Sequence, residues 1–150
     1  MRFKSVEEAL KGEAETFEEI PLDQYCFPLS FAFLTNRKPV IDRQLVINDE
    51  KSYQKLLLIR RSEQKCLTMN LPPINFEKKT MLAQYTSGSC AISGFNKRVF
   101  KDGHRHVVNY VVEPIRRRFP CSGMPGESLN LIVVPKVPAN YKVDFLYKTF

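Results

Sequence analysis

The sequence predicts a mainly β protein of the α+β class, a twisted antiparallel sheet or sandwich of about six to eight strands with one docked helix and a short N-terminal helix or arm. Its 11 phenylalanines and six tyrosines suit half-buried strands, and its ten prolines and six glycines mark many turns. In the second half of the chain, apolar and polar residues alternate in short runs that end at turn residues. Together these observations favour strands over helices.

A chain of 150 residues, of which 43% are hydrophobic, is long enough for one hydrophobic core and too short for two. We therefore predict an N-terminal arm or short helix over residues 1–27 and a single β-rich domain over residues 28–150.

The N-terminal third has few regular signals. Ser5 begins a capping-box pattern, but Gly12 interrupts the short apolar stripe that follows, so residues 5–16 are predicted as a short helix or an arm. Prolines bracket residues 17–28, which we interpret as a connector. Residues 27–34 are apolar enough to form a strand.

The segment after residue 43 predicts a strand followed by a helix. Residues 44–48 form the strand, and Asn48 or Asp49 caps a helix that continues to about residue 59. Tyr53 begins an apolar face at helical spacing, so we expect this helix to dock on the sheet through that face.

Pro72 and Pro73 separate the irregular half from the strand-rich half, since proline cannot donate to a ladder and favours an extended entry. A short strand over residues 66–69 precedes them. Clearer strands follow over residues 79–86, 90–100, 104–115, 129–135 and 141–149.

Two details of these strands are predicted. Lys101, Asp102 and Gly103 form a hairpin turn in which Asp-Gly supplies a positive φ angle. In the last strand one face is buried and the other mostly solvated. The buried face consists of Tyr141, Val143, Phe145 and Tyr147, and we expect Phe76 to belong to the same core.

A net charge of +7 and a pI near 9.3 favour anionic partners. Cations gather along one predicted hairpin and its exit, with aromatic residues between them. This basic hairpin contains Lys97, Arg98, Lys101, Arg105, Arg116, Arg117 and Arg118. Such a mixture suits nucleic acid, but an edge hairpin that charge protects from aggregation, or that meets an acidic protein face, is the simpler explanation.

The sequence gives only weak candidates for a catalytic site, and an enzyme that uses a histidine with Cys90 or Cys121 as nucleophile is the weakest of three hypotheses. It contains none of the phosphate-loop, nucleophile-elbow, dinucleotide or HExxH motifs. His104 and His106 would share a strand face but lack a third metal ligand apart from Asp102. Glu113 and Asp144 are candidates for an acid pair, but single carboxylates on strands are ordinarily solvated. We therefore predict no enzyme activity, no metal and no cofactor.

Four cysteines, Cys26, Cys66, Cys90 and Cys121, are widely spaced and form no CxxC pair, which argues against zinc-ribbon and thioredoxin-type motifs. Their even number suggests two disulfides, although four buried free thiols would fit nearly as well. A hairpin turning at residues 101–103 brings Cys90 and Cys121 to the same end, so we predict that they pair and that Cys26 pairs with Cys66.

Short motifs resemble the PrcB C-terminal-like domains of bacterial envelope proteins, over roughly two thirds of the chain. That family has a characteristic strand-to-helix start, a P-x-I-D-F element that opens the sheet, and a late v-x-v-P-K. The matching residues are Leu45, Val46, Ile47, Asn48, Tyr53, Leu56, Cys66, Leu71, Pro72, Pro73, Ile74, Asn75, Phe76, Thr80, Met81, Leu82, Val133, Val134, Pro135 and Lys136. Asn75 departs from the usual aspartate.

The resemblance implies a non-enzymatic exported domain, which in one case belongs to a lipoprotein that stabilises a surface protease complex. We therefore expect a periplasmic, outer-membrane-associated or secreted module, in a mature chain from which the export signal has been removed; a cytoplasmic location is the alternative. We expect it to hold a protein partner through a strand edge or the basic hairpin. A nucleic-acid or anionic-surface binder is the second hypothesis.

Overall fold

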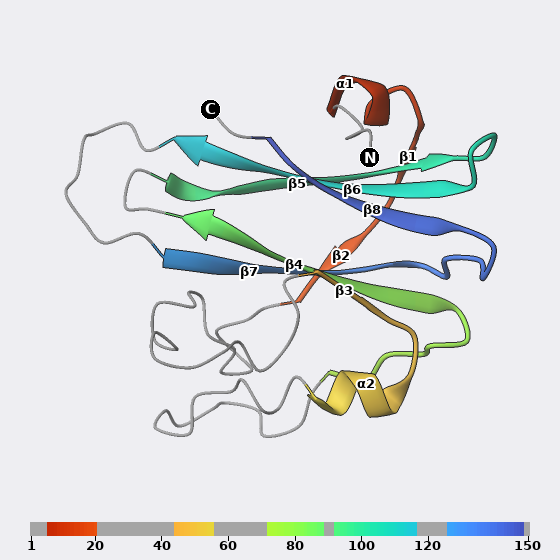
Figure 1. Ribbon diagram of the computed structural model, residues 1–150. Helices are drawn as coiled ribbons and strands as arrows, with labels where there is room; N and C mark the ends of the chain where they lie inside the picture. Colours follow the sequence, from red (N-terminus) through yellow and green to blue (C-terminus); the bar gives the residue numbers. More distant parts are fainter. Residues whose placement is uncertain (1–5, 21–43, 56–71, 89–91, 117–125, 149–150) are drawn as a thin grey trace, which may run out of the picture.

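The computed structural model describes residues 6–20, 44–55, 72–88, 92–116 and 126–148. These residues form two β-sheets that pack face to face, with a short helix on each outer face (Figure 1). In chain order the elements are α1 (Val6–Ala9), β1 (Glu13–Glu15), β2 (Glu18–Glu19), β3 (Gln44–Ile47), α2 (Glu50–Gln54), β4 (Lys79–Gly88), β5 (Ile92–Asp102), β6 (Val107–Arg116), β7 (Gly126–Pro135) and β8 (Lys142–Tyr147).

Each sheet has four strands. Sheet A has the order β1-β5-β6-β8 and sheet B the order β2-β7-β4-β3. Every pairing is antiparallel except that of β6 with β8, which is parallel because the chain crosses from sheet B to sheet A before β8 begins. The predicted mainly β fold, an antiparallel sheet or sandwich with a docked helix and a short N-terminal helix or arm, is confirmed as a sandwich, with one parallel pair in place of a purely antiparallel arrangement.

Three apolar layers stabilise this arrangement. The central layer lies between the sheets and contains Leu82, Val99, Val108, Tyr110, Val112, Ile132, Val134 and Val137. A second layer covers the outer face of sheet B, and a smaller third layer joins α1 to the outer face of sheet A. Consequently the middle parts of β4 and β7 are buried on both faces, and their buried residues include polar ones, Thr80, Gln84, Thr86 and Asn130, as well as apolar ones.

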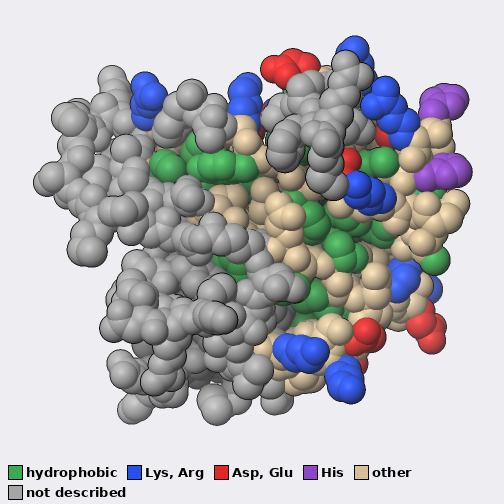
Figure 2. All heavy atoms as spheres, in the orientation of Figure 1, with side chains coloured by type: hydrophobic (Ala, Val, Ile, Leu, Met, Phe, Trp, Pro, Cys, Tyr) green, Lys and Arg blue, Asp and Glu red, His purple; other side chains and the backbone are tan. Residues whose placement is uncertain are grey.

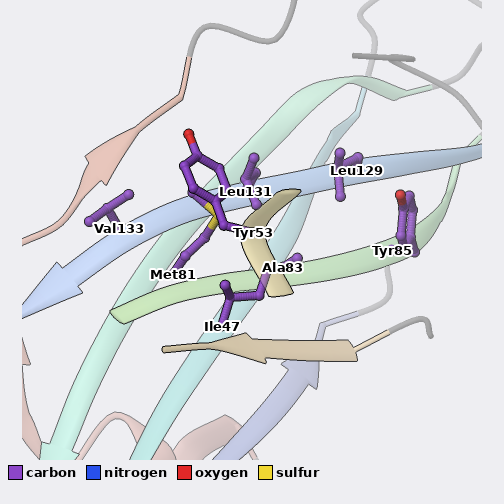
Figure 3. Close-up of a cluster of buried hydrophobic side chains, with 8 residues drawn as sticks. All are labelled: Ile47, Tyr53, Met81, Ala83, Tyr85, Leu129, Leu131 and Val133. Atoms are coloured by element: carbon purple, nitrogen blue, oxygen red, sulfur yellow. The ribbon is translucent and has the colours of Figure 1, made fainter. Parts of the chain in front are cut away.

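Helix α2 docks on sheet B through Tyr53, as predicted. Asp49 caps the helix, because its carboxylate accepts a hydrogen bond from the backbone N–H of Ser52 at 2.7 Å. The Tyr53 ring lies over Met81 and Leu131 (Figure 3), and its hydroxyl donates to the carbonyl of Pro72 at 2.6 Å. The predicted continuation of the helix beyond Lys55 lies outside the described residues.

The hairpin turn differs from the prediction. Asp102 still pairs with Val107, so the loop comprises residues 103–106, and His106 has the positive φ angle, 54°, while no described glycine has one. Asp102 fixes the loop by accepting the backbone N–H groups of His104 and Arg105, each at 3.1 Å. A loop of four residues replaces the tight Asp-Gly turn, and the histidines lie in it rather than on a strand.

The phase predicted for the last strand is confirmed, since Tyr141, Val143, Phe145 and Tyr147 all pack against the central layer. The prediction that Phe76 shares this core is wrong, because Phe76 packs on the opposite face of sheet B. Sheet B separates the two layers. The strands predicted over residues 27–34 and 66–69 lie outside the described residues.

The region predicted as an arm and a connector contains two short strands. Strands β1 and β2 belong to one extended segment, the N-terminal strap (residues 13–20), which pairs first with β5 and then with β7. Phe17, between the two strands, packs against the central layer. The strap therefore closes one side of the sandwich by crossing from sheet A to sheet B.

Candidate partner-binding edge

The side of the sandwich opposite the strap is formed by β8 in sheet A and β3 in sheet B. We call this pair of edge strands the open side. Within the described part of the chain, no strand pairs with the outer edge of either one. Strand β8 is the longer edge, with six residues against four for β3.

Every second residue of β8 points its backbone N–H and C=O groups away from the sheet. Lys142 donates its backbone N–H to the carbonyl of His106 at 2.9 Å, and Lys148 donates to Val112 at 3.0 Å. In a parallel pair, the N–H and C=O of one residue point to the same side and successive residues alternate. The even-numbered residues of β8 therefore face β6, and the N–H and C=O groups of Val143 and Phe145 point away from the sheet.

Apolar side chains lie beside this edge without being fully covered. Val143 and Phe145 are directed between the sheets but are only half-buried. Across the open side, Leu45 and Ile47 of β3 pack on the outer layer of sheet B, so Val46 faces the other way, and it is 42% exposed. This is the largest exposure of any large hydrophobic residue among those described.

Polar groups also occur in the interior behind the open side. Burial raises the pKa of Tyr147, the last residue of β8. Further inside, burial and the nearby Glu19 carboxylate raise the pKa of the Tyr110 hydroxyl, which donates to the carbonyl of Asn130 at 3.1 Å. The side-chain oxygen of Gln84 is buried without a hydrogen-bond partner. The central layer thus contains polar groups, at Tyr110 and Gln84, as well as apolar ones.

The tip of the basic hairpin adjoins the start of β8. The rings of His106 and Tyr141 lie 5.2 Å apart, and the Lys101 ammonium lies 5.0 Å from the centre of the Tyr141 ring. The Lys142 side chain is 70% exposed and lies 3.7 Å from the carboxylate of Asp144. Figure 2 shows the two histidines together at one end of the molecule, near exposed cations. The edge and the hairpin tip thus form one continuous region.

The other predicted basic residues do not share one face. Lys97 pairs with Glu19 of the strap. Arg98 pairs with Glu113, while Arg105 pairs with Asp102 in the turn. Arg116 lies opposite Ile92, at the far end of the hairpin from the turn. Arg117 and Arg118 lie outside the described residues. Most of the described hairpin cations therefore have acidic neighbours and point in different directions.

The remaining candidate residues are also dispersed. Glu113 and Asp144 do not form the acid pair considered from the sequence. Asp144 lies opposite Asn109 in the β6–β8 register, four residues before Glu113. Each carboxylate also has its own cationic neighbour, Arg98 for Glu113 and Lys142 for Asp144. Across the described ranges, no group of three or more potential metal ligands occurs. All four cysteines lie outside these ranges.

Between the sheets, at the end where β5 and β6 turn, lies a cavity of about 30 Å³. Its lining includes four valines, Val99, Val108, Val134 and Val137, and two lysines, Lys101 and Lys136. This volume suits a water molecule rather than an organic ligand.

Several described residues of the motifs behind the predicted family resemblance lie close to Lys136. Its ammonium donates to the carbonyl of Phe76 at 2.8 Å and to the side-chain oxygen of Asn48 at 3.1 Å. Thr80 donates to that same Asn48 oxygen at 2.7 Å and accepts the backbone N–H of Val137 at 3.0 Å. Asn75 caps the adjoining turn through Glu77 N–H at 3.1 Å. In this chain the motif residues therefore hold β3, β4 and β7 together.

Comparison with protein-family models, with curated proteins and with solved structures finds no match to this chain. Neither helix in the described ranges has the length and hydropathy needed to cross a membrane. The candidate site is therefore defined by its geometry alone: an edge strand with outward backbone groups, half-covered apolar residues beside it, and cations at its ends.

Proposed function

We propose that this protein is a non-enzymatic binding module that holds an extended segment of a protein partner along the outer edge of β8. The observation that carries the proposal is the outward direction of the Val143 and Phe145 backbone groups, with no described strand beside them. Strand addition satisfies such groups with main-chain hydrogen bonds and requires no catalytic residue.

Two further observations support this proposal. Val143, Phe145 and Val46 offer apolar surface into which alternate side chains of an added strand would pack. Lys142 and Lys148 stand at the two ends of β8, and lysine on an edge strand discourages pairing with unselected strands. An edge strand that has apolar surface beside it and a lysine at each end is suited to bind one specific partner segment.

We place this activity in the bacterial envelope, as an exported domain that is stabilised by disulfides and joins another envelope component. The motif resemblance and the even cysteine number support this setting. The nucleic-acid alternative gains no support from the dispersed and ion-paired arrangement of the hairpin cations.

The test is selection of extended peptides from a random displayed library against the immobilised protein. Val143→Pro removes an outward N–H without removing a ladder bond to β6, so this variant should lose the selected peptides. Val143→Ala keeps the N–H and removes only side-chain atoms, so it should retain them. Both variants are first checked for native secondary structure by circular dichroism.

A second measurement does not depend on a variant that folds. In the free protein the amide hydrogens of Val143 and Phe145 should exchange quickly with solvent, and a selected peptide should protect them. Selected peptides that bind Val143→Pro as well as wild type, with no protection at these two amides, would show that β8 is not the binding edge.

A further inference from the structure

We infer that the partner segment is acidic and alternates acidic with apolar or aromatic residues. This inference rests on the proposed function and specifies its ligand. It draws on the charges along β8 and on the way the chain's own strap occupies the opposite side of the sandwich.

The strap shows which kind of strand these sheet edges accept. Residues 13–20 contain four glutamates and no cation. Glu13 lies directly opposite Lys101 in the β1–β5 register, and Glu19 pairs with Lys97. An acidic extended segment with one aromatic residue, Phe17, thus covers the edges of β5 and β7.

The open side has matching chemistry and no such strap among the described residues. Residues 136–148 contain three lysines, Lys136, Lys142 and Lys148, and a single acid, Asp144. Lys142 and Lys148 are exposed. They lie six positions apart along extended chain, or about 20 Å. Two acidic side chains on an added strand can therefore meet them at the same time.

Strand alternation predicts the rest of the pattern. The side chains of Lys142 and Lys148 lie on the face of sheet A that points away from sheet B, because the alternate residues Val143 and Phe145 point between the sheets. An added strand in the same sheet must follow this alternation. Its acidic residues therefore fall on the lysine side, and its intervening residues fall beside Val143, Phe145 and Val46.

The test uses three labelled synthetic peptides of nine residues with one fixed pattern, Ser-X-Phe-X-Val-X-Phe-X-Ser, where X is Glu, Gln or Lys. Fluorescence anisotropy should give an affinity about five- to tenfold higher for the Glu peptide than for the Gln peptide, and a lower affinity for the Lys peptide. Higher salt should narrow these differences, because the lysines are exposed.

Charge reversal supplies the matched comparison. The double variant Lys142→Glu/Lys148→Glu should reverse the order and favour the Lys peptide. The control is Lys51→Glu/Lys55→Glu, at an exposed position of α2 and at the exposed C-cap that follows it, which changes the net charge equally and should keep the preference for the Glu peptide. If both double variants lose the preference to the same extent, the preference reflects net charge and the inference fails.

The outcomes separate the inference from the proposed function. Equal binding of all three peptides, lost in Val143→Pro, would keep β8 as a binding edge and overturn the acidic pattern. Failure of all three peptides to bind, together with no library-selected peptide that protects the Val143 and Phe145 amides, would overturn both. Sedimentation of the protein alone is the last check, since a dimer that Val143→Pro dissociates would identify a second copy as the occupant and overturn the acidic partner.

Discussion

At the residue scale, the buried Thr80 shows how one side chain joins several elements. It is fully buried, its hydroxyl donates to Asn48, and it accepts the backbone N–H of Val137. One small polar residue thus connects β4, the end of β3 and the segment after β7. The hydroxyl stabilises the folded protein through these hydrogen bonds, because a buried polar group without a partner lowers the free energy of unfolding.

We predict that Thr80→Val destabilises the protein by about 2–3 kcal/mol, because it leaves the Val137 N–H without an acceptor and removes the shorter of the two hydrogen bonds to the Asn48 side-chain oxygen, which keeps only the Lys136 ammonium as a donor. Thr80→Ser keeps the hydroxyl and should cost about 1 kcal/mol through the lost methyl group. Urea unfolding of both variants measures the difference. Equal losses would mean that the hydroxyl contributes little.

His106 is the second informative residue, since it holds a left-handed backbone conformation at φ 54° in the hairpin loop. A β-branched residue tolerates this conformation poorly. We predict that His106→Val lowers stability by roughly 1–2 kcal/mol. His104→Val, in the same exposed loop, should cost much less. Thermal unfolding distinguishes them, and similar melting temperatures for both would contradict the assigned loop conformation.

At the element scale, β8 combines a paired edge and an outer edge in one strand. The backbone N–H and C=O groups of its even-numbered residues point toward β6, and those of its odd-numbered residues point away from the sheet. We predict that Asp144→Pro destabilises the protein by about 1–3 kcal/mol more than Val143→Pro, because only the former removes a hydrogen bond between strands. Denaturant unfolding provides the comparison. A larger loss for Val143→Pro would reverse the assigned orientation of the strand and remove the basis of the proposed site.

At the scale of the whole molecule, the residues that flank the connection from β4 to β5 are paired with the residues that flank the connection from β6 to β7. Gly88 pairs with Gly126, and Ile92 pairs with Arg116, at the same end of the sandwich. Cys90 and Cys121 are in these two connections. The disulfides Cys90–Cys121 and Cys26–Cys66 remain predictions from the sequence.

Intact mass after thiol alkylation, with and without reductant, should show no alkylated cysteine in the unreduced protein and four after reduction. Reduction should lower stability by about 2–4 kcal/mol for each bond. Four alkylated thiols in the unreduced protein would rule out both disulfides.

The sequence by itself determined part of the local structure of this protein. Alternation in residues 141–149 identified the inward face of β8, and a cap at Asn48 or Asp49 followed by Tyr53 identified a helix that docks on a sheet. These features depend on neighbours a few residues apart, and their periodicity is therefore visible in the chain. Sequence reasoning also found the cationic hairpin, but it treated those cations as one cluster.

Only the tertiary structure decided which strands are neighbours and which layer each side chain joins. The parallel pairing of β8, the separation of Phe76 from Phe145 by sheet B, and the strap that crosses between the sheets all depend on contacts between distant residues. Alternation shows that a strand has an inward face but does not specify the sheet that covers it. An outer edge is likewise a property of strand order, so the proposed site in β8 had no signal of its own in the sequence.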